Sequence, residues 1–63
     1  MFITKHAYKR AHQRMGISKN ALARIVNRVE SDGTVICSDG DMTQIEYGNN
    51  RFILRGNYLV TIL

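Results

Sequence analysis

The sequence predicts an α+β fold, in which two N-terminal helices pack on one face of a 3–4-stranded antiparallel β-meander. Hydrophobic residues recur with a helical period over roughly the first half of the chain. After Gly33 the pattern changes to short alternating runs that are separated by glycine-containing turns. A chain of 63 residues has enough apolar surface for one small core. We therefore expect residues 1–63 to form a single domain.

The first helix is expected to run from about Thr4 to Met15. Ala7, Ala11 and Met15 recur every four residues and form an apolar stripe. Gly16 follows at the position where helices end in a left-handed residue, a conformation that glycine tolerates. We therefore expect the first helix to pack through this stripe onto the meander.

The second helix is expected to begin after Ser18, which is a good N-cap, and to end near Ser31. Its apolar residues follow the i, i+3, i+4, i+7 pattern of one helix face. They are Leu22, Ile25, Val26 and Val29.

Four strand-like segments follow, at residues 34–37, 42–47, 51–55 and 58–63. In the third segment Phe52 and Leu54 point to one side, and this is the better candidate for the core face. Cys37 lies in a β-branched run, and we expect it to be a small buried hydrophobic residue.

Positive charge is concentrated in the first half of the chain. Residues 1–30 contain seven Lys and Arg against Glu30 alone, a net charge of +6, whereas residues 31–63 have a net charge of −2. An anionic partner would meet the helical half, and nucleic acid is the commonest such partner. No apolar run approaches the ~20 residues of a membrane span, so no membrane partner is expected.

Cysteine and histidine content points to a reducing compartment and to no bound metal. A single cysteine cannot form an internal disulfide, which favours a cytoplasmic location. His6 and His12 are six residues apart and fall on different helix faces, so they are poor co-ligands for a metal. We expect neither a metal nor another cofactor.

His6, Arg10 and Arg14 are spaced i, i+4, i+8 and would stack along one face of the first helix. An imidazole can transfer a proton, and a guanidinium can hold a phosphate through two donors. The set therefore indicates phosphodiester chemistry or phosphate binding. A solvated basic face explains the same spacing equally well.

The chain also resembles a known group of proteins over most of its length. His6-Ala7, Arg10, Arg14, Ile17-Ser18 and the closing segment 59–62 match a small family of uncharacterised function with a His-Ala, Arg, Arg, Gly-Ile pattern. That family is grouped with RelE/ParE-like toxins in the barnase–EndoU–colicin–RelE ribonuclease superfamily. The resemblance implies a RelE-like domain from a toxin–antitoxin system, with an antitoxin or a target as protein partner.

The resemblance further implies metal-independent endoribonuclease activity. His6 would transfer the proton, Arg10 would bind the reacting phosphate, and Thr61 on the last strand would orient a group. Further basic side chains would hold RNA or another polyanion. These residues are Lys5, Lys9, Arg14, Lys19, Arg24, Arg28, Arg51 and Arg55.

Two other functions fit the same sequence. The first is a helix-turn-helix DNA-binding regulator, with Gly16 in the turn and residues 48–50 as a wing. Its recognition helix would present Lys19, Asn20, Ala23, Arg24 and Asn27. The second is a small non-catalytic inhibitor or interaction protein of a phage or other mobile element, whose basic face would bind an acidic protein groove.

Overall fold

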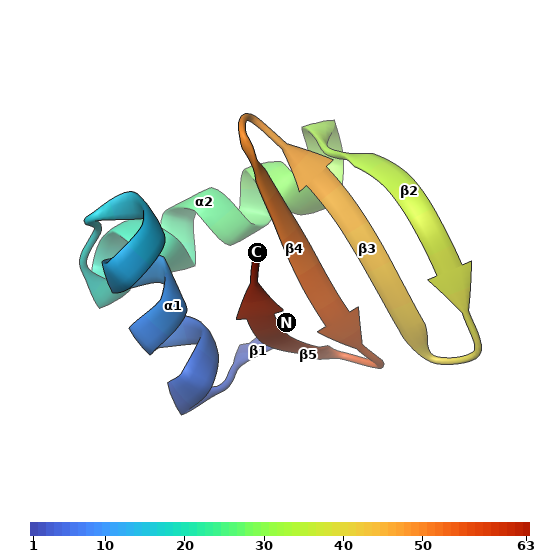
Figure 1. The fold of residues 1–63 in the computed structure, drawn as a ribbon, viewed down its shortest axis with the longest axis horizontal. Helices are drawn as coiled ribbons and strands as arrows, with labels where there is room; N and C mark the ends of the chain where they lie inside the picture. The colour runs from blue at the N-terminus through green and yellow to red at the C-terminus, as the bar shows by residue number, and fades with distance from the viewer.

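A computed structural model describes residues 1–63 as two helices and one five-stranded sheet (Figure 1). The elements in chain order are β1 (Phe2–Ile3), α1 (Lys5–Met15), α2 (Lys19–Asp32), β2 (Thr34–Asp39), β3 (Met42–Tyr47), β4 (Asn50–Arg55) and β5 (Tyr58–Ile62). The strand order across the sheet is β1-β5-β4-β3-β2. The α+β class is confirmed, whereas the expected number of strands was too low.

The additional strand is β1, which precedes α1. It pairs in parallel with β5, matching Phe2 to Tyr58 and Ile3 to Leu59, and this makes an otherwise antiparallel sheet mixed. Two residues are too few to show an alternating pattern, so the sequence contains no signal for this strand. The pairing brings the first residues of the chain beside its last strand (Figure 1).

Gly16 and Ser18 cap the helices as expected, and Thr4 caps the start of α1. The hydroxyl of Thr4 accepts a hydrogen bond from the Ala7 amide at 3.2 Å, and that of Ser18 accepts one from the Ala21 amide at 3.2 Å. Gly16 ends α1 in the left-handed conformation with φ of 64°. The turn between the helices is therefore short and determined by local chemistry.

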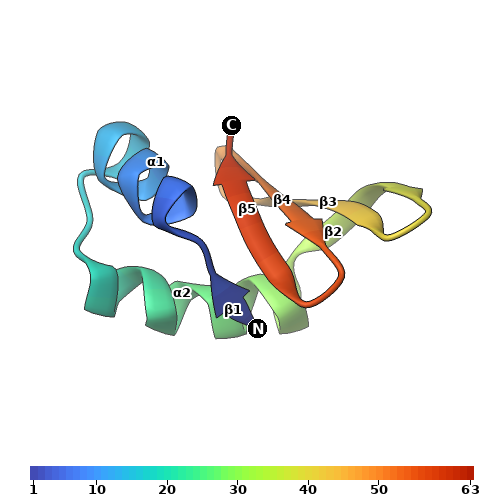
Figure 2. The same cartoon turned by 90° about the horizontal axis from the view of Figure 1, so that it is seen from below.

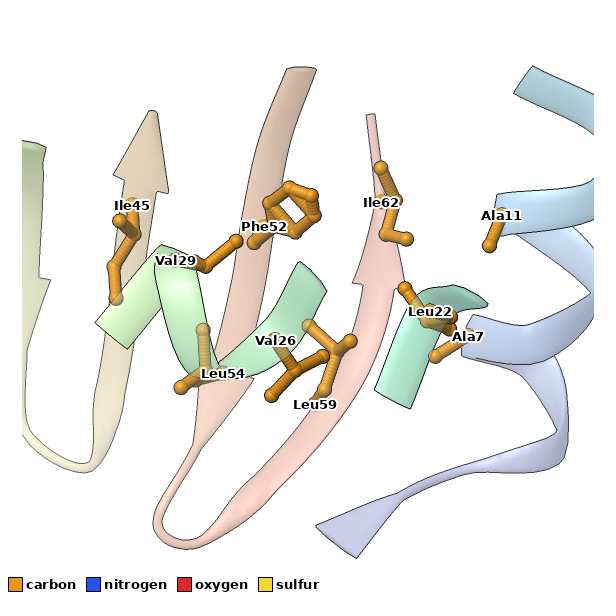
Figure 3. Packing of buried hydrophobic residues seen from close by; sticks show 10 residues of the cluster. All are labelled: Ala7, Ala11, Leu22, Val26, Val29, Ile45, Phe52, Leu54, Leu59 and Ile62. Atoms are coloured by element: carbon orange, nitrogen blue, oxygen red, sulfur yellow. The ribbon is translucent and has the colours of Figure 1, made fainter. Parts of the chain in front are cut away.

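One core of ten buried residues joins the helices to a single face of the sheet (Figure 3). The expected Phe52 and Leu54 are both in it. Of the four apolar residues expected on one face of α2, Leu22, Val26 and Val29 are buried. Ile25 is only half-buried and packs at the edge of the core. The core residues are Ala7, Ala11, Leu22, Val26, Val29, Ile45, Phe52, Leu54, Leu59 and Ile62.

The helices cover the sheet unevenly. Viewed from below, α2 runs across the strands and α1 lies beside β5 (Figure 2). All six residues of β2 are exposed at the free edge, and Cys37 is exposed with them. The expectation that Cys37 is buried was wrong. A β-branched run predicts a strand, but it does not tell whether another layer packs on that strand.

The other face of the sheet carries no helix. Arg51, Ile53 and Arg55 alternate with the buried Phe52 and Leu54, as the sequence predicted, and so project from this uncovered face. Neither α1 nor α2 has the length and hydrophobicity that a membrane-spanning helix requires.

Candidate anion-binding site

The structure contains one pocket, with a volume of about 450 Å³, between α1 and the start of α2. Its lining combines three lysines, one histidine and two hydrophobic side chains, and it includes no acidic residue. The lining residues are Lys5, Tyr8, Lys9, His12, Ile17, Ser18 and Lys19.

Helix geometry explains why α1 supplies four of these residues. Lys5, Tyr8, Lys9 and His12 are spaced i, i+3, i+4 and i+7, so they share one flank of the helix. The Ala7 and Ala11 stripe packs into the core next to that flank. The short turn after Gly16 then brings the first residues of α2 across from it.

Tyr8 and Lys19 connect the two helices across the pocket. The Lys19 ammonium nitrogen lies 5.4 Å from the centroid of the Tyr8 ring, within the range of a cation–π contact. Tyr8 is half-buried and packs against the core, and it also lines the pocket. The residue therefore serves both the core and the pocket wall.

The pocket is electropositive. Lys5, Lys9 and Lys19 are exposed and form no ion pair, and the first turn of neither helix contains an acidic residue. The pocket also lies at the N-terminus of α2, where free backbone N–H groups and the helix dipole favour negative charge. An anion with several oxygen atoms, such as a phosphate, suits this arrangement.

The residues assigned to catalysis lie elsewhere. His6 and Arg14 are exposed and Arg10 is half-buried, on the flank of α1 that does not line the pocket. Thr61 pairs with Ile53 and therefore projects from the sheet face opposite the core. No cavity in the structure is lined by His6, Arg10 or Thr61.

Of the side chains expected to contact nucleic acid, the pocket gathers three, namely Lys5, Lys9 and Lys19. The others are exposed in separate places. Arg14 is on α1, Arg24 and Arg28 are on α2, and Arg51 and Arg55 are on β4. Arg55 forms an exposed ion pair with Asp41 at 3.4 Å, which contributes little to stability.

Four of the lining residues were not assigned to a site from the sequence, namely Tyr8, His12, Ile17 and Ser18. Lys5, Lys9 and His12 are spaced i, i+4, i+7 and share one flank of α1, just as His6, Arg10 and Arg14 share another, so the sequence contains two basic flanks of similar appearance. Only the packing of α2 against one flank makes a concave site there. The structure contains no cluster of three His, Cys, Asp or Glu side chains that could hold a metal ion.

No protein-family model, no curated protein and no solved structure matched the chain.

Proposed function

We propose that this domain binds RNA and that it holds phosphates in the pocket between α1 and α2. One observation carries the proposal: Lys5, Lys9 and Lys19, from two different helices, converge on one concavity that no acidic side chain lines. Lysine is a common phosphate ligand, and clustered lysines on one face are the electrostatic footprint of nucleic-acid binding. Among polyanions, RNA is favoured by the resemblance of the His-Ala, Arg, Arg, Gly-Ile pattern to ribonuclease-like toxins.

Exposed arginines provide contacts for the neighbouring phosphates of a longer chain. Arg24 and Arg28 are exposed on α2, which begins at the pocket, and Arg14 is exposed on α1. All three belong to the half of the chain with a net charge of +6. The helical layer is thus the proposed RNA-binding side of the domain.

Cleavage of the bound RNA is a second part of the proposal, with His6 as the proton-transfer residue. His6 is exposed on α1 next to Lys5, so its imidazole is free to meet a phosphodiester that follows the pocket. Arg10 is one helical turn further along and would stabilise charge on the reacting phosphate. This part rests on the family resemblance alone, and phosphate binding in the pocket does not require cleavage.

DNA binding by α2 is the second candidate function. Its support is the short turn at Gly16 and the exposure of the whole outward face of α2. The exposed side chains that would read a major groove are Lys19, Asn20, Ala23, Arg24 and Asn27.

The deciding experiment compares two double variants that remove the same charge. Fluorescence anisotropy with a labelled single-stranded RNA and with duplex DNA would be measured for Lys5→Gln/Lys9→Gln and for Arg51→Gln/Arg55→Gln. The first pair lines the pocket, and the second lies on the uncovered sheet face.

We expect RNA affinity to fall about 10-fold or more for the pocket variant and much less for the sheet variant, because two phosphate contacts are lost only in the first. Equal losses would contradict the pocket as the binding site. The helix-turn-helix function would be favoured instead if the wild type bound duplex DNA more tightly than RNA and if Arg24→Gln/Asn27→Ala lost that DNA affinity.

A further inference from the structure

We propose that the pocket between α1 and α2 accepts one unpaired nucleotide, with its base stacked on Tyr8 and its phosphate held by the lysines. This inference rests on the proposed function and names the class of RNA that the site takes, namely single-stranded RNA. It explains the presence of Tyr8 and Ile17 in the pocket wall, which phosphate binding alone does not require.

The composition of the pocket wall is the first argument. Tyr8 and Ile17 are its two hydrophobic residues, and they lie among Lys5, Lys9 and Lys19. A site for phosphate alone needs cations and donors but no apolar surface. An aromatic ring and an aliphatic side chain, with ammonium groups around them, match a ligand that is flat and apolar at one end and anionic at the other.

The position of Lys19 is the second argument. Its ammonium lies over the Tyr8 ring at 5.4 Å, so this ring face is accessible and is not covered by the core. Lys19 is exposed, and its side chain is long and flexible. A base can take its place on the ring, while the ammonium moves to the phosphate of the same nucleotide.

The size of the pocket is the third argument. Its volume of about 450 Å³ lies in the ordinary range of small-ligand sites, which is roughly 300–1,000 Å³. A base within a duplex is stacked and paired, so it could reach Tyr8 only after leaving the helix. The site therefore discriminates against double-stranded RNA.

The test uses the wild-type protein and three small ligands. AMP has a base and a phosphate, ribose 5-phosphate has only the phosphate, and adenosine has only the base. We expect calorimetry to show AMP binding about 10-fold or more tightly than either of the others, in line with base–aromatic stacking of about this strength. Single-stranded RNA should likewise bind more tightly than duplex RNA of the same length.

Variants at Tyr8 locate the effect. Tyr8→Leu should reduce AMP affinity to that of ribose 5-phosphate, whereas Tyr8→Phe should keep it, because the ring and not the hydroxyl stacks on the base. Lys9→Gln should weaken AMP and ribose 5-phosphate alike. Circular dichroism would establish that Tyr8→Leu folds, and the comparison of ligands on the wild type does not depend on that variant.

The outcomes separate this inference from the proposed function. Suppose that the protein binds RNA, but binds AMP no more tightly than ribose 5-phosphate and single-stranded RNA no more tightly than duplex RNA. This result would overturn the nucleotide pocket but leave the proposed function intact. If the protein binds no RNA even at low salt, both fall together.

Discussion

The Cα atom of Gly33 lies directly against the side chain of Ile45. A β-carbon built on Gly33 would overlap the Ile45 Cγ2 methyl group and come within 2.5 Å of the Val29 carbonyl oxygen. Gly33 has a φ of −70°, which any residue can adopt, so close packing and not backbone conformation requires glycine here. This residue is where the chain leaves α2 and enters β2 beside the core.

Replacing Gly33 with alanine should destabilise the domain. A methyl group in a space already filled by Ile45 and the Val29 carbonyl forces a backbone shift, at a cost of about 1–3 kcal/mol. For a domain of this size, each kcal/mol lowers the melting temperature by roughly 4–8 °C. Thermal melts would show the loss, with the exposed Thr34→Ala as control. A Gly33→Ala melt equal to that of the control would mean that α2 and β3 are less closely packed.

Thr4 ties the start of α1 to the last strand. Its hydroxyl oxygen accepts a hydrogen bond from the Ala7 amide. Its single O–H donates to two neighbouring carbonyl oxygens that share it, that of Leu59 at 3.1 Å and that of Val60 at 3.2 Å. Thr4→Val keeps the shape but loses these bonds, so we expect a loss of about 1–2 kcal/mol in unfolding free energy. Thr4→Ser keeps the hydroxyl and should stay within about 0.5 kcal/mol of wild type in urea denaturation.

Leu22 and Ile25 should differ in their contribution to stability, although both belong to the apolar pattern of α2. Leu22 is fully buried, so Leu22→Ala should cost about 2–5 kcal/mol. That is a large part of the roughly 3–9 kcal/mol available to a domain of this length. Ile25 is half-buried, and its alanine variant should cost roughly 1 kcal/mol. Equal losses in chemical denaturation would show that the buried face of α2 is misplaced.

RNA binding should weaken linearly on a log–log plot against salt concentration, because each phosphate contact releases counterions. For a single strand the slope should be about 0.7 per phosphate contacted. Removing the ammonium group in Lys19→Gln should reduce the slope by about one such contact. Anisotropy titrations at several salt concentrations measure this directly. A slope that stays the same in Lys19→Gln would exclude this lysine as a phosphate ligand.

If the domain cleaves RNA, His6→Ala should lower the rate about 10²–10⁴-fold and leave RNA affinity nearly unchanged. Arg14→Ala should do the reverse, since we expect it to hold a neighbouring phosphate. Gln13→Ala is the matched control, because Gln13 is exposed on α1, carries no charge and does not line the pocket. The assay follows a labelled RNA with purified protein. RNA that is bound but stays intact with the wild type would make this a binding domain without nuclease activity.

Local chemistry determined much of this fold from the sequence alone. The caps at Ser18 and Gly16 could be predicted because the groups that satisfy a helix terminus are close in sequence. The alternation around Phe52 and Leu54 identified the core face of β4, since successive strand residues point to opposite sides. The concentration of positive charge in residues 1–30 likewise needs no structure.

The tertiary structure alone decided how these parts meet. Pairing of Phe2 and Ile3 with β5 joins residues more than fifty positions apart, and a two-residue strand has no pattern of its own. Cys37 is exposed because β2 lies at an edge that no helix covers, which depends on where the helices end. The pocket likewise depends on where the helices lie. The first helix, α1, has two basic flanks, and a pocket lined by Lys5, Lys9 and Lys19 forms only at the flank that faces the start of α2.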